Sequence, residues 1–363
     1  MNEVVVGRTA ARGRQGVEAQ PAVARLDLPR ALQLGLAAMW LLDGVLQFQP
    51  FMYTRAFAQM LASSAAGNPP FIARPITWDA NLVQGHLALL NTTFATVQLL
   101  LGLGIAIRPT VRPALAASVA WSLAVWWLGE GFDGILSGSS SPVGGAPGAV
   151  ILYALLAVLL WPAYRPGAPP PFVAARAVGA RAARTLWLVL WLSLAFFTLT
   201  PANRAPGALS GALTDAAAGE PAWLAGLGRH AAALVAGQGL AASVLLAVSF
   251  VMIAAGVFLP RRAARAAIAL AIVVATLIWV IGQALGMILA TGATDPNSGP
   301  LLILLALAYW PAGTPTSAFP APRPATSRPA TSRPASRPAT STPATSAPGE
   351  PEPARGGETG LTA

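Results

Sequence analysis

The 363-residue chain has no cysteine and no lysine, and charged residues make up only 10% of it. The lack of cysteine excludes disulfide bridges, thiolate zinc sites and thiol redox chemistry by the chain itself. The scarcity of charge, with 55% hydrophobic residues and a mean hydropathy of +0.60, excludes an ordinary water-soluble surface. A lipid bilayer is the solvent that suits this composition.

A net charge of +10 would also fit a nucleic-acid-binding protein, but the placement of the arginines excludes that class. They lie at the ends of hydrophobic runs or in the C-terminal segment, and they do not gather on one predicted face. If the N-terminus is cytoplasmic, 19 of the 23 arginines lie on the inner side of the membrane. This asymmetry predicts a multi-pass protein of a bacterial inner membrane with both termini in the cytoplasm.

Eight apolar runs approach or exceed the length needed to cross about 30 Å of hydrocarbon. They cover residues 31–48, 87–107, 114–128, 149–161, 185–199, 231–259, 266–290 and 301–310. The first is interrupted only by Asp43, and the fourth and eighth are short. The sequence therefore predicts an all-α integral membrane protein with eight transmembrane helices.

The second half of the chain repeats landmarks of the first half in the same order. Trp126 and the Gly129-Glu130 pair return 153 residues later as Trp279 and Gly282-Gln283, and the Trp-Pro-Ala triplet at 161–163 returns 149 residues later. Each half holds four predicted spans, an even number, so both halves enter the membrane in the same orientation. The prediction is two parallel four-helix repeats, related by an axis along the membrane normal.

These features divide the chain into five predicted regions. Residues 1–30 form an arginine-rich cytoplasmic segment, and residues 165–184 form a cytoplasmic linker between the four-helix units at 31–164 and 185–312. Residues 313–363 repeat an Arg-Pro-Ala-Thr-Ser motif that cannot build a core, so we expect a disordered tail.

Several features of each half resemble the DoxX/DoxD-like family of four-helix membrane proteins. They are a long first outer loop, Gly102 and Gly104 at the end of the second span, the Arg108-Pro109 inner turn and the Gly129-Glu130-Gly131 stretch. The resemblance covers residues 34–162, with a degenerate copy at 185–311. It implies a small membrane subunit associated with redox systems, such as a thiosulfate:quinone oxidoreductase subunit, and hence a redox partner protein and quinone-linked chemistry.

Ionisable residues inside membrane spans are costly, so each one is a candidate functional residue. Asp43 in the first span, His86 at the start of the second, and Glu130 with Asp133 at the end of the third should lie at similar depth in the outer leaflet. Adjacent helices of one bundle would then bring Asp43, His86 and Glu130 together.

The matching positions of the second half are uncharged: Leu194, Gln238, Gln283 and, for Asp133, Gly286. This difference predicts that the first half carries the site and that the second half is a structural partner that lost it.

Three kinds of chemistry fit the Asp43, His86 and Glu130 cluster. It could hold a divalent metal ion such as Zn, Mn or Fe. It could exchange protons with a quinone or another small ligand bound between the helices. It could also be a hydrogen-bonded network that only joins three helices.

The corresponding functions are a redox-associated subunit, a non-catalytic scaffold or assembly factor, and a small-solute or metal transporter. Parallel repeats with one charged half do not favour the transporter. The sequence shows no arrangement of nucleophile and base, so it leaves open whether the protein is an enzyme.

Overall fold

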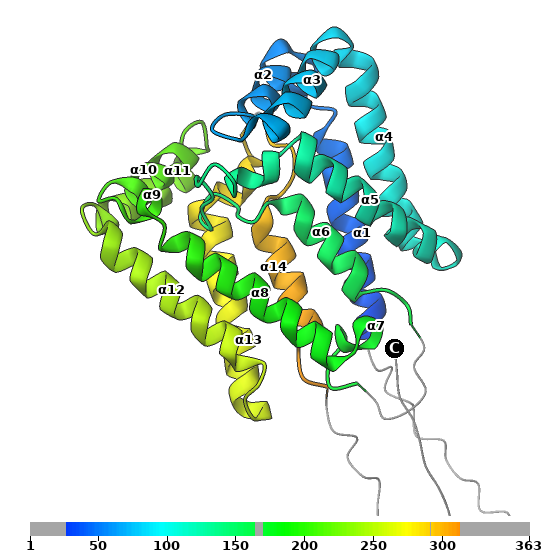
Figure 1. Cartoon of the computed structure of the whole chain (residues 1–363), viewed down its shortest axis with the longest axis vertical. Coiled ribbons are helices and arrows are strands. Elements are labelled where there is room, and N and C mark those ends of the chain that lie inside the picture. The colour runs from blue at the N-terminus through cyan, green and yellow to red at the C-terminus, as the bar shows by residue number, and fades with distance from the viewer. Residues whose placement is uncertain (1–26, 164–169, 291, 313–363) are drawn as a thin grey trace, which may run out of the picture. The chain divides into compact units, whose positions relative to one another are not determined.

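Helices are the regular secondary structure of this protein in the computed structural model, which describes residues 27–163, 170–290 and 292–312 (Figure 1). No strand occurs among these residues. The expectations for residues 1–30 and 313–363 fall outside the described part, except that residues 28–30 belong to the first helix. The expected all-α fold is therefore confirmed over the described ranges.

Five helices are long and apolar enough to cross a membrane. They are α4 (Leu87–Ala106), α5 (Val111–Leu128) with the preceding turn Arg108–Thr110, α8 (Ala180–Thr198), α12 (Gly239–Gly256), and α13 (Arg261–Leu277) with its extension Ile278–Gly282. Large apolar side chains on these helices, among them Leu89, Leu192 and Leu245, are exposed. Their exposure is costly in water and favourable in lipid, as expected for a membrane protein.

The other three predicted spans do not have the length and composition of a membrane-crossing helix. The first coincides with α1 (Leu28–Leu46), which carries Arg30 and Asp43. The fourth and eighth coincide with α6 (Ala149–Leu159) and α14 (Ser298–Ala308). Each of these has 11 residues and is only about 16 Å long at about 1.5 Å per residue. Eight spans are thus not confirmed.

Two of the predicted runs were also too long. The run at 231–259 is broken between α11 (Ala222–Val235) and α12, where Gly237 has a positive φ of 73°. The run at 266–290 leaves the helical conformation after Gly282, where residues 284–287 all have positive φ. Hydrophobicity alone does not report such breaks because the residues on both sides remain apolar.

Short helices fill the long loops that follow α1 and α8. The first loop contains the 3-10 turn Pro50–Tyr53, α2 (Arg55–Ser63) and α3 (Pro70–Gly85), and the second contains α9 (Pro201–Arg204), α10 (Ala208–Ala216) and α11. Residues 50–63 thus form a 3-10 turn followed by α2. The predicted linker contains α7 (Ala175–Val178) and the first turn of α8.

The helices pack in the same pairs in both parts of the chain. Helix α1 packs on α4 as α8 packs on α12, and α5 packs on α6 as α13 packs on α14. The contact of α6 with α14 joins the two sets, and one apolar core includes Trp40, Tyr153, Trp191 and Tyr309. The buried Trp40 indole donates a hydrogen bond to Ser118 Oγ over 2.9 Å, which links α1 to α5.

Element positions recur at a nearly constant offset. Helices α1 and α8 begin at Leu28 and Ala180, and α4 and α12 begin at Leu87 and Gly239, so both pairs are offset by 152 residues. Four successive residues with positive φ occur at 131–134 and again 153 residues later at 284–287. These offsets agree with those read from the sequence landmarks.

Candidate ligand cavity

A cavity of about 220 Å³ contains two of the three predicted site residues, Asp43 and Glu130. Its walls come from α1, α2, α3, α4, α5, the start of α6 and the loop before α14. The remaining lining residues are Gln47, Phe57, Met60, Leu61, Asp79, Phe94, Gln98, Trp121, Ala124, Val125, Leu128, Gly129, Val150, Thr294 and Asp295. No basic residue is among them, so the cavity is acidic.

Glu130 is positioned by the end of α5 and by the start of α6. Its Oε1 atom accepts a long hydrogen bond, 3.4 Å, from the backbone N–H of Val150, while its Oε2 atom is buried and has no hydrogen-bond partner in the described structure. Gly148 has a φ of 104°, and a Cβ added there would lie 2.2 Å from Oε2. A glycine is therefore needed at 148 both for the backbone and for the space that the carboxyl group occupies.

Asp43 enters the cavity from the fifth turn of α1 and is 2% exposed. Its Oδ1 atom has no hydrogen-bond partner among the described residues. The Tyr153 hydroxyl lies within hydrogen-bonding range of the Asp43 carboxyl group, and it also interacts electrostatically with Glu130 and Asp295. Buried polar atoms without partners are rare in folded proteins, and several at one cavity indicate a place for a ligand or water.

Two further carboxyl groups line the cavity, and sequence reasoning missed both. Asp79 comes from α3 and is half-buried. Asp295 comes from the loop before α14, in the second half of the chain, where it accepts hydrogen bonds from the Thr294 hydroxyl at 2.8 Å and from the Asn297 N–H at 2.6 Å. The expectation that the first half alone carries the site is corrected, because Thr294 and Asp295 of the second half form part of the wall.

The carboxyl groups in the loops around the cavity favour their protonated forms. Burial, followed by repulsion from Asp295 and Asp133, raises the pKa of Glu130 well above its ordinary value. Burial raises the pKa of Asp133 to about 7. A protonated carboxyl group can donate as well as accept a hydrogen bond, so Glu130 can serve a ligand in either role.

An aromatic and apolar wall faces these acids. Phe57 comes from α2, and Phe94 of α4 packs against Trp121 of α5 with ring centroids 5.8 Å apart. The Trp121 Nε1 atom and the side-chain oxygens of Gln47 and Gln98 are buried without hydrogen-bond partners among the described residues. The cavity thus combines an aromatic and apolar surface with unpaired donors and acceptors, as small-molecule sites do.

His86 does not join the two carboxyl groups. It is exposed at the junction of α3 and α4, and it is not among the residues that line the cavity. No group of three or more His, Asp or Glu residues suited to a metal ion occurs within the described residues. The expected meeting of Asp43, His86 and Glu130 fails because α3 ends at Gly85, which leaves His86 in the link to α4.

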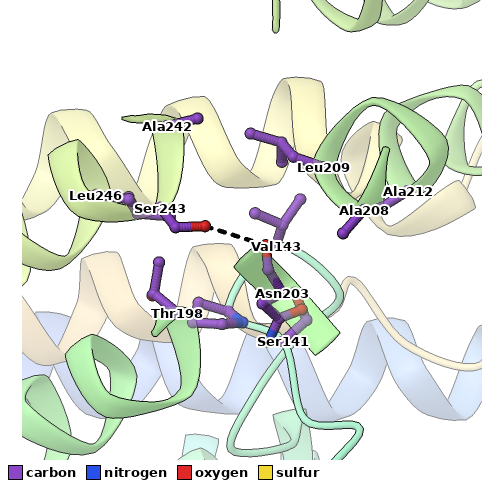
Figure 2. Close-up of a pocket in the computed structure, with 11 residues that line it drawn as sticks. Ser141, Val143, Thr198, Asn203, Ala208, Leu209, Ala212, Ala242, Ser243 and Leu246 are labelled. Atoms are coloured by element: carbon purple, nitrogen blue, oxygen red, sulfur yellow. Dashed lines mark hydrogen bonds between the residues drawn. The ribbon is translucent and has the colours of Figure 1, made fainter. Parts of the chain in front are cut away.

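A smaller cavity of about 100 Å³, lined by residues 141–143 of the first half and by residues of the second half, contains no ionisable residue (Figure 2). It is lined by residues that include Thr198, Asn203, Leu209, Ser243 and Leu246. Ser243 Oγ donates a hydrogen bond of 3.0 Å to the Asn203 carbonyl oxygen, the dashed line in Figure 2. The Thr198 and Asn203 side chains donate to backbone carbonyl oxygens outside the cavity, and none of its lining side chains has a buried polar atom without a partner among the described residues.

Comparison with protein-family models, curated proteins and solved structures finds no match to this chain.

Proposed function

We propose that this protein is a DoxX-like, redox-associated membrane subunit that binds a quinone or its quinol in the acidic cavity. The observation that carries the proposal is the pairing of the Phe94–Trp121 wall with the unpaired carboxyl oxygens of Asp43 and Glu130 in one cavity. A quinone ring is flat and apolar with polar oxygens at its edge, so it matches both surfaces.

The hydrogen-bonding groups suit both redox forms of such a ligand. A quinol hydroxyl donates to the unpaired Oδ1 of Asp43 or Oε2 of Glu130. A quinone carbonyl accepts from the protonated Glu130, whose raised pKa favours that form, or from Trp121 Nε1. The absence of a basic residue from the lining disfavours an anionic ligand.

The role assigned to the carboxyl groups is to take up protons. Oxidation of a quinol releases two electrons and two protons, and Glu130 and Asp295, which line the cavity, can receive the protons when they are ionised. The chain has no cysteine to carry the electrons as a dithiol, so the proposal requires a redox partner protein that accepts them.

The proposed architecture is two parallel four-helix units, eight crossings in all, in a bacterial inner membrane with cytoplasmic termini. The constant offset of the helices and the matching helix pairs support the duplication. Helices α6 and α14 are too short to cross alone, and we propose that each crosses together with the loop before it. Residues 140–148 are buried or half-buried except for Gly144, and non-helical backbone at membrane depth requires such cover.

Titration of detergent-purified protein with decylubiquinone and with decylubiquinol, followed by calorimetry, tests the binding. We expect Glu130→Gln to weaken quinol binding roughly tenfold or more, because an amide nitrogen replaces an acceptor. The fold should tolerate this change, since Gln283 at the matching position accepts the equivalent hydrogen bond from the Gly299 N–H at 3.2 Å. Asp43→Asn should weaken binding similarly.

The matched control is Asp215→Asn, which removes an exposed carboxyl group of α10 and should change neither affinity nor melting temperature. Equal affinity of wild type, Glu130→Gln and Asp43→Asn would disprove the site. Absence of binding by the wild type, with lower stability in the Asp43 variant, would instead favour the scaffold function.

A further inference from the structure

A second, basic pocket of about 400 Å³ lies at the opposite end of the first set of helices from Glu130. Its walls are the start of α1, the turn between α4 and α5, the end of α6 and the segment that contains α7. Four arginines line it, Arg30, Arg108, Arg112 and Arg176, with a single acidic residue, Asp27. This excess of positive charge in a concave site calls for an anionic ligand.

Two of the four arginines are held by the fold. The Arg30 guanidinium donates to the carbonyl oxygens of Ile105 and Ala106 at the end of α4, and Arg112 donates to the Pro162 carbonyl oxygen over 3.1 Å. A cation at the carboxyl end of a helix is also favoured by the helix dipole. These two side chains therefore have a structural role.

Arg108 and Arg176 have no such role in the described structure. Both side chains are exposed, and neither forms a hydrogen bond or ion pair with another described residue. Because guanidinium groups present several N–H donors in a fixed plane, two of them facing one pocket are well suited to a phosphate group.

The apolar part of the same pocket indicates where this phosphate comes from. Leu159, Leu160 and Trp161 line it together with the arginines. Tryptophan next to arginine at the end of a membrane helix is typical of headgroup depth, where acyl chains meet polar groups. Basic pockets between membrane helices bind the headgroups of anionic lipids.

We propose that this pocket binds the phosphate of an anionic phospholipid headgroup, with Arg108 and Arg176 as its ligands. The site is independent of the acidic cavity, and it stands whether or not that cavity binds a quinone.

The test is native mass spectrometry of the full-length purified protein with dioleoyl-phosphatidylglycerol and, for comparison, dioleoyl-phosphatidylcholine. The variant Arg108→Gln/Arg176→Gln should bind phosphatidylglycerol about tenfold or more weakly than wild type, given the contribution of each arginine to headgroup binding. Phosphatidylcholine should bind weakly to both proteins. The matched control, Arg74→Gln/Arg229→Gln, removes two exposed arginines from α3 and α11 and should bind like wild type.

Inorganic phosphate and glycerol 3-phosphate distinguish a lipid from a soluble ligand. Under the proposal neither displaces the lipid at millimolar concentration. Displacement that requires Arg108 and Arg176 would support a phosphate site but assign it to a soluble anion. Undiminished lipid binding by the Arg108/Arg176 variant, or an equal loss in the Arg74/Arg229 control, would overturn the proposal.

Discussion

At the scale of single residues, Asp133 makes the stability of the protein depend on pH. It lies three residues after Glu130, its Oδ2 atom is buried without a hydrogen-bond partner among the described residues, and burial raises its pKa to about 7. In the unfolded chain the pKa of the same group returns to about 3.8. At a pH between these two pKa values, Asp133 is mostly protonated in the folded protein and mostly ionised in the unfolded chain.

This difference predicts that stability falls as pH rises from about 4 to about 7. The free energy of unfolding should decrease across that window and then level off as far as Asp133 is concerned. Glu130, whose pKa is also raised, acts in the same direction. Asp133→Asn should make the decrease smaller, and asparagine tolerates the positive φ of 51° at this position.

Thermal unfolding of wild type and Asp133→Asn in detergent at pH 4.5, 6 and 7.5 measures the effect. Asp215→Asn serves as the exposed control. A wild-type melting temperature that rises over this range, or an unchanged slope in Asp133→Asn, would contradict the assignment.

The sequence predicted part of the site at this scale because a charge inside an apolar run is conspicuous. Asp43 and Glu130 were found in this way, and both line the cavity. Asp295 was missed because it lies in a loop. A carboxyl group in a loop has no evident energetic cost, so the sequence does not indicate it as a candidate functional residue. Trp161 and Trp310 are 149 residues apart, and the same offset aligns Asp295 with Ala146. This comparison would have identified Asp295 as a charged residue whose counterpart in the first half is uncharged.

At the scale of elements, the chain reverses its helical hand after α5. Gly131, Phe132, Asp133 and Gly134 all have φ between 51° and 67°, so they form a short left-handed turn. Each non-glycine residue in that conformation costs roughly 1–2 kcal/mol. The turn directly follows Glu130, which lines the cavity, and it begins the connection from α5 to α6.

The two copies of this turn allow a matched pair of substitutions. Gly131→Ala should lower the melting temperature by several degrees, because the new Cβ would lie 2.3 Å from the Ser64 carbonyl oxygen and the backbone has a φ of 57°. The reverse change at the corresponding position, Ala284→Gly, removes a side chain from a φ of 45° and should leave stability equal or higher. Differential scanning fluorimetry of both variants decides the matter, and a destabilised Ala284→Gly with an unaffected Gly131→Ala would refute the account.

Hydrophobic patterning located most helices but could not locate these turns. The run at 266–290 is apolar on both sides of the reversal, and the run at 231–259 is apolar on both sides of Gly237. Apolar composition reports depth in the membrane, whereas the local direction of the chain depends on backbone angles. The glycines at 131 and 134 are consistent with positive φ and so indicate the first reversal. The matching positions 284 and 287 are alanine and methionine, which give no such indication of the second.

At the scale of the whole molecule, the absence of cysteine makes the proposed topology directly measurable. Single cysteines at exposed positions give unambiguous labelling because no native thiol competes. Ser63→Cys and Thr214→Cys lie in the loops proposed to be periplasmic, and Thr110→Cys and Ala263→Cys lie at the proposed cytoplasmic turns.

A membrane-impermeant maleimide applied to intact spheroplasts should label the first pair, and it should label the second pair only after the membrane is opened. Labelling of the second pair alone would invert the orientation. Different accessibility of Ser63→Cys and Thr214→Cys would refute the parallel repeats, since those two positions must lie on the same side.

The contribution of Asp295 to the acidic cavity has a consequence for how this protein evolves. Because both halves contribute to the wall, neither half alone could form the intact cavity. A gene shortened to residues 1–184 would encode the apolar wall together with Asp43 and Glu130 but leave the cavity open on one side. If the two halves are the repeats proposed above, neither half could keep this cavity without the other.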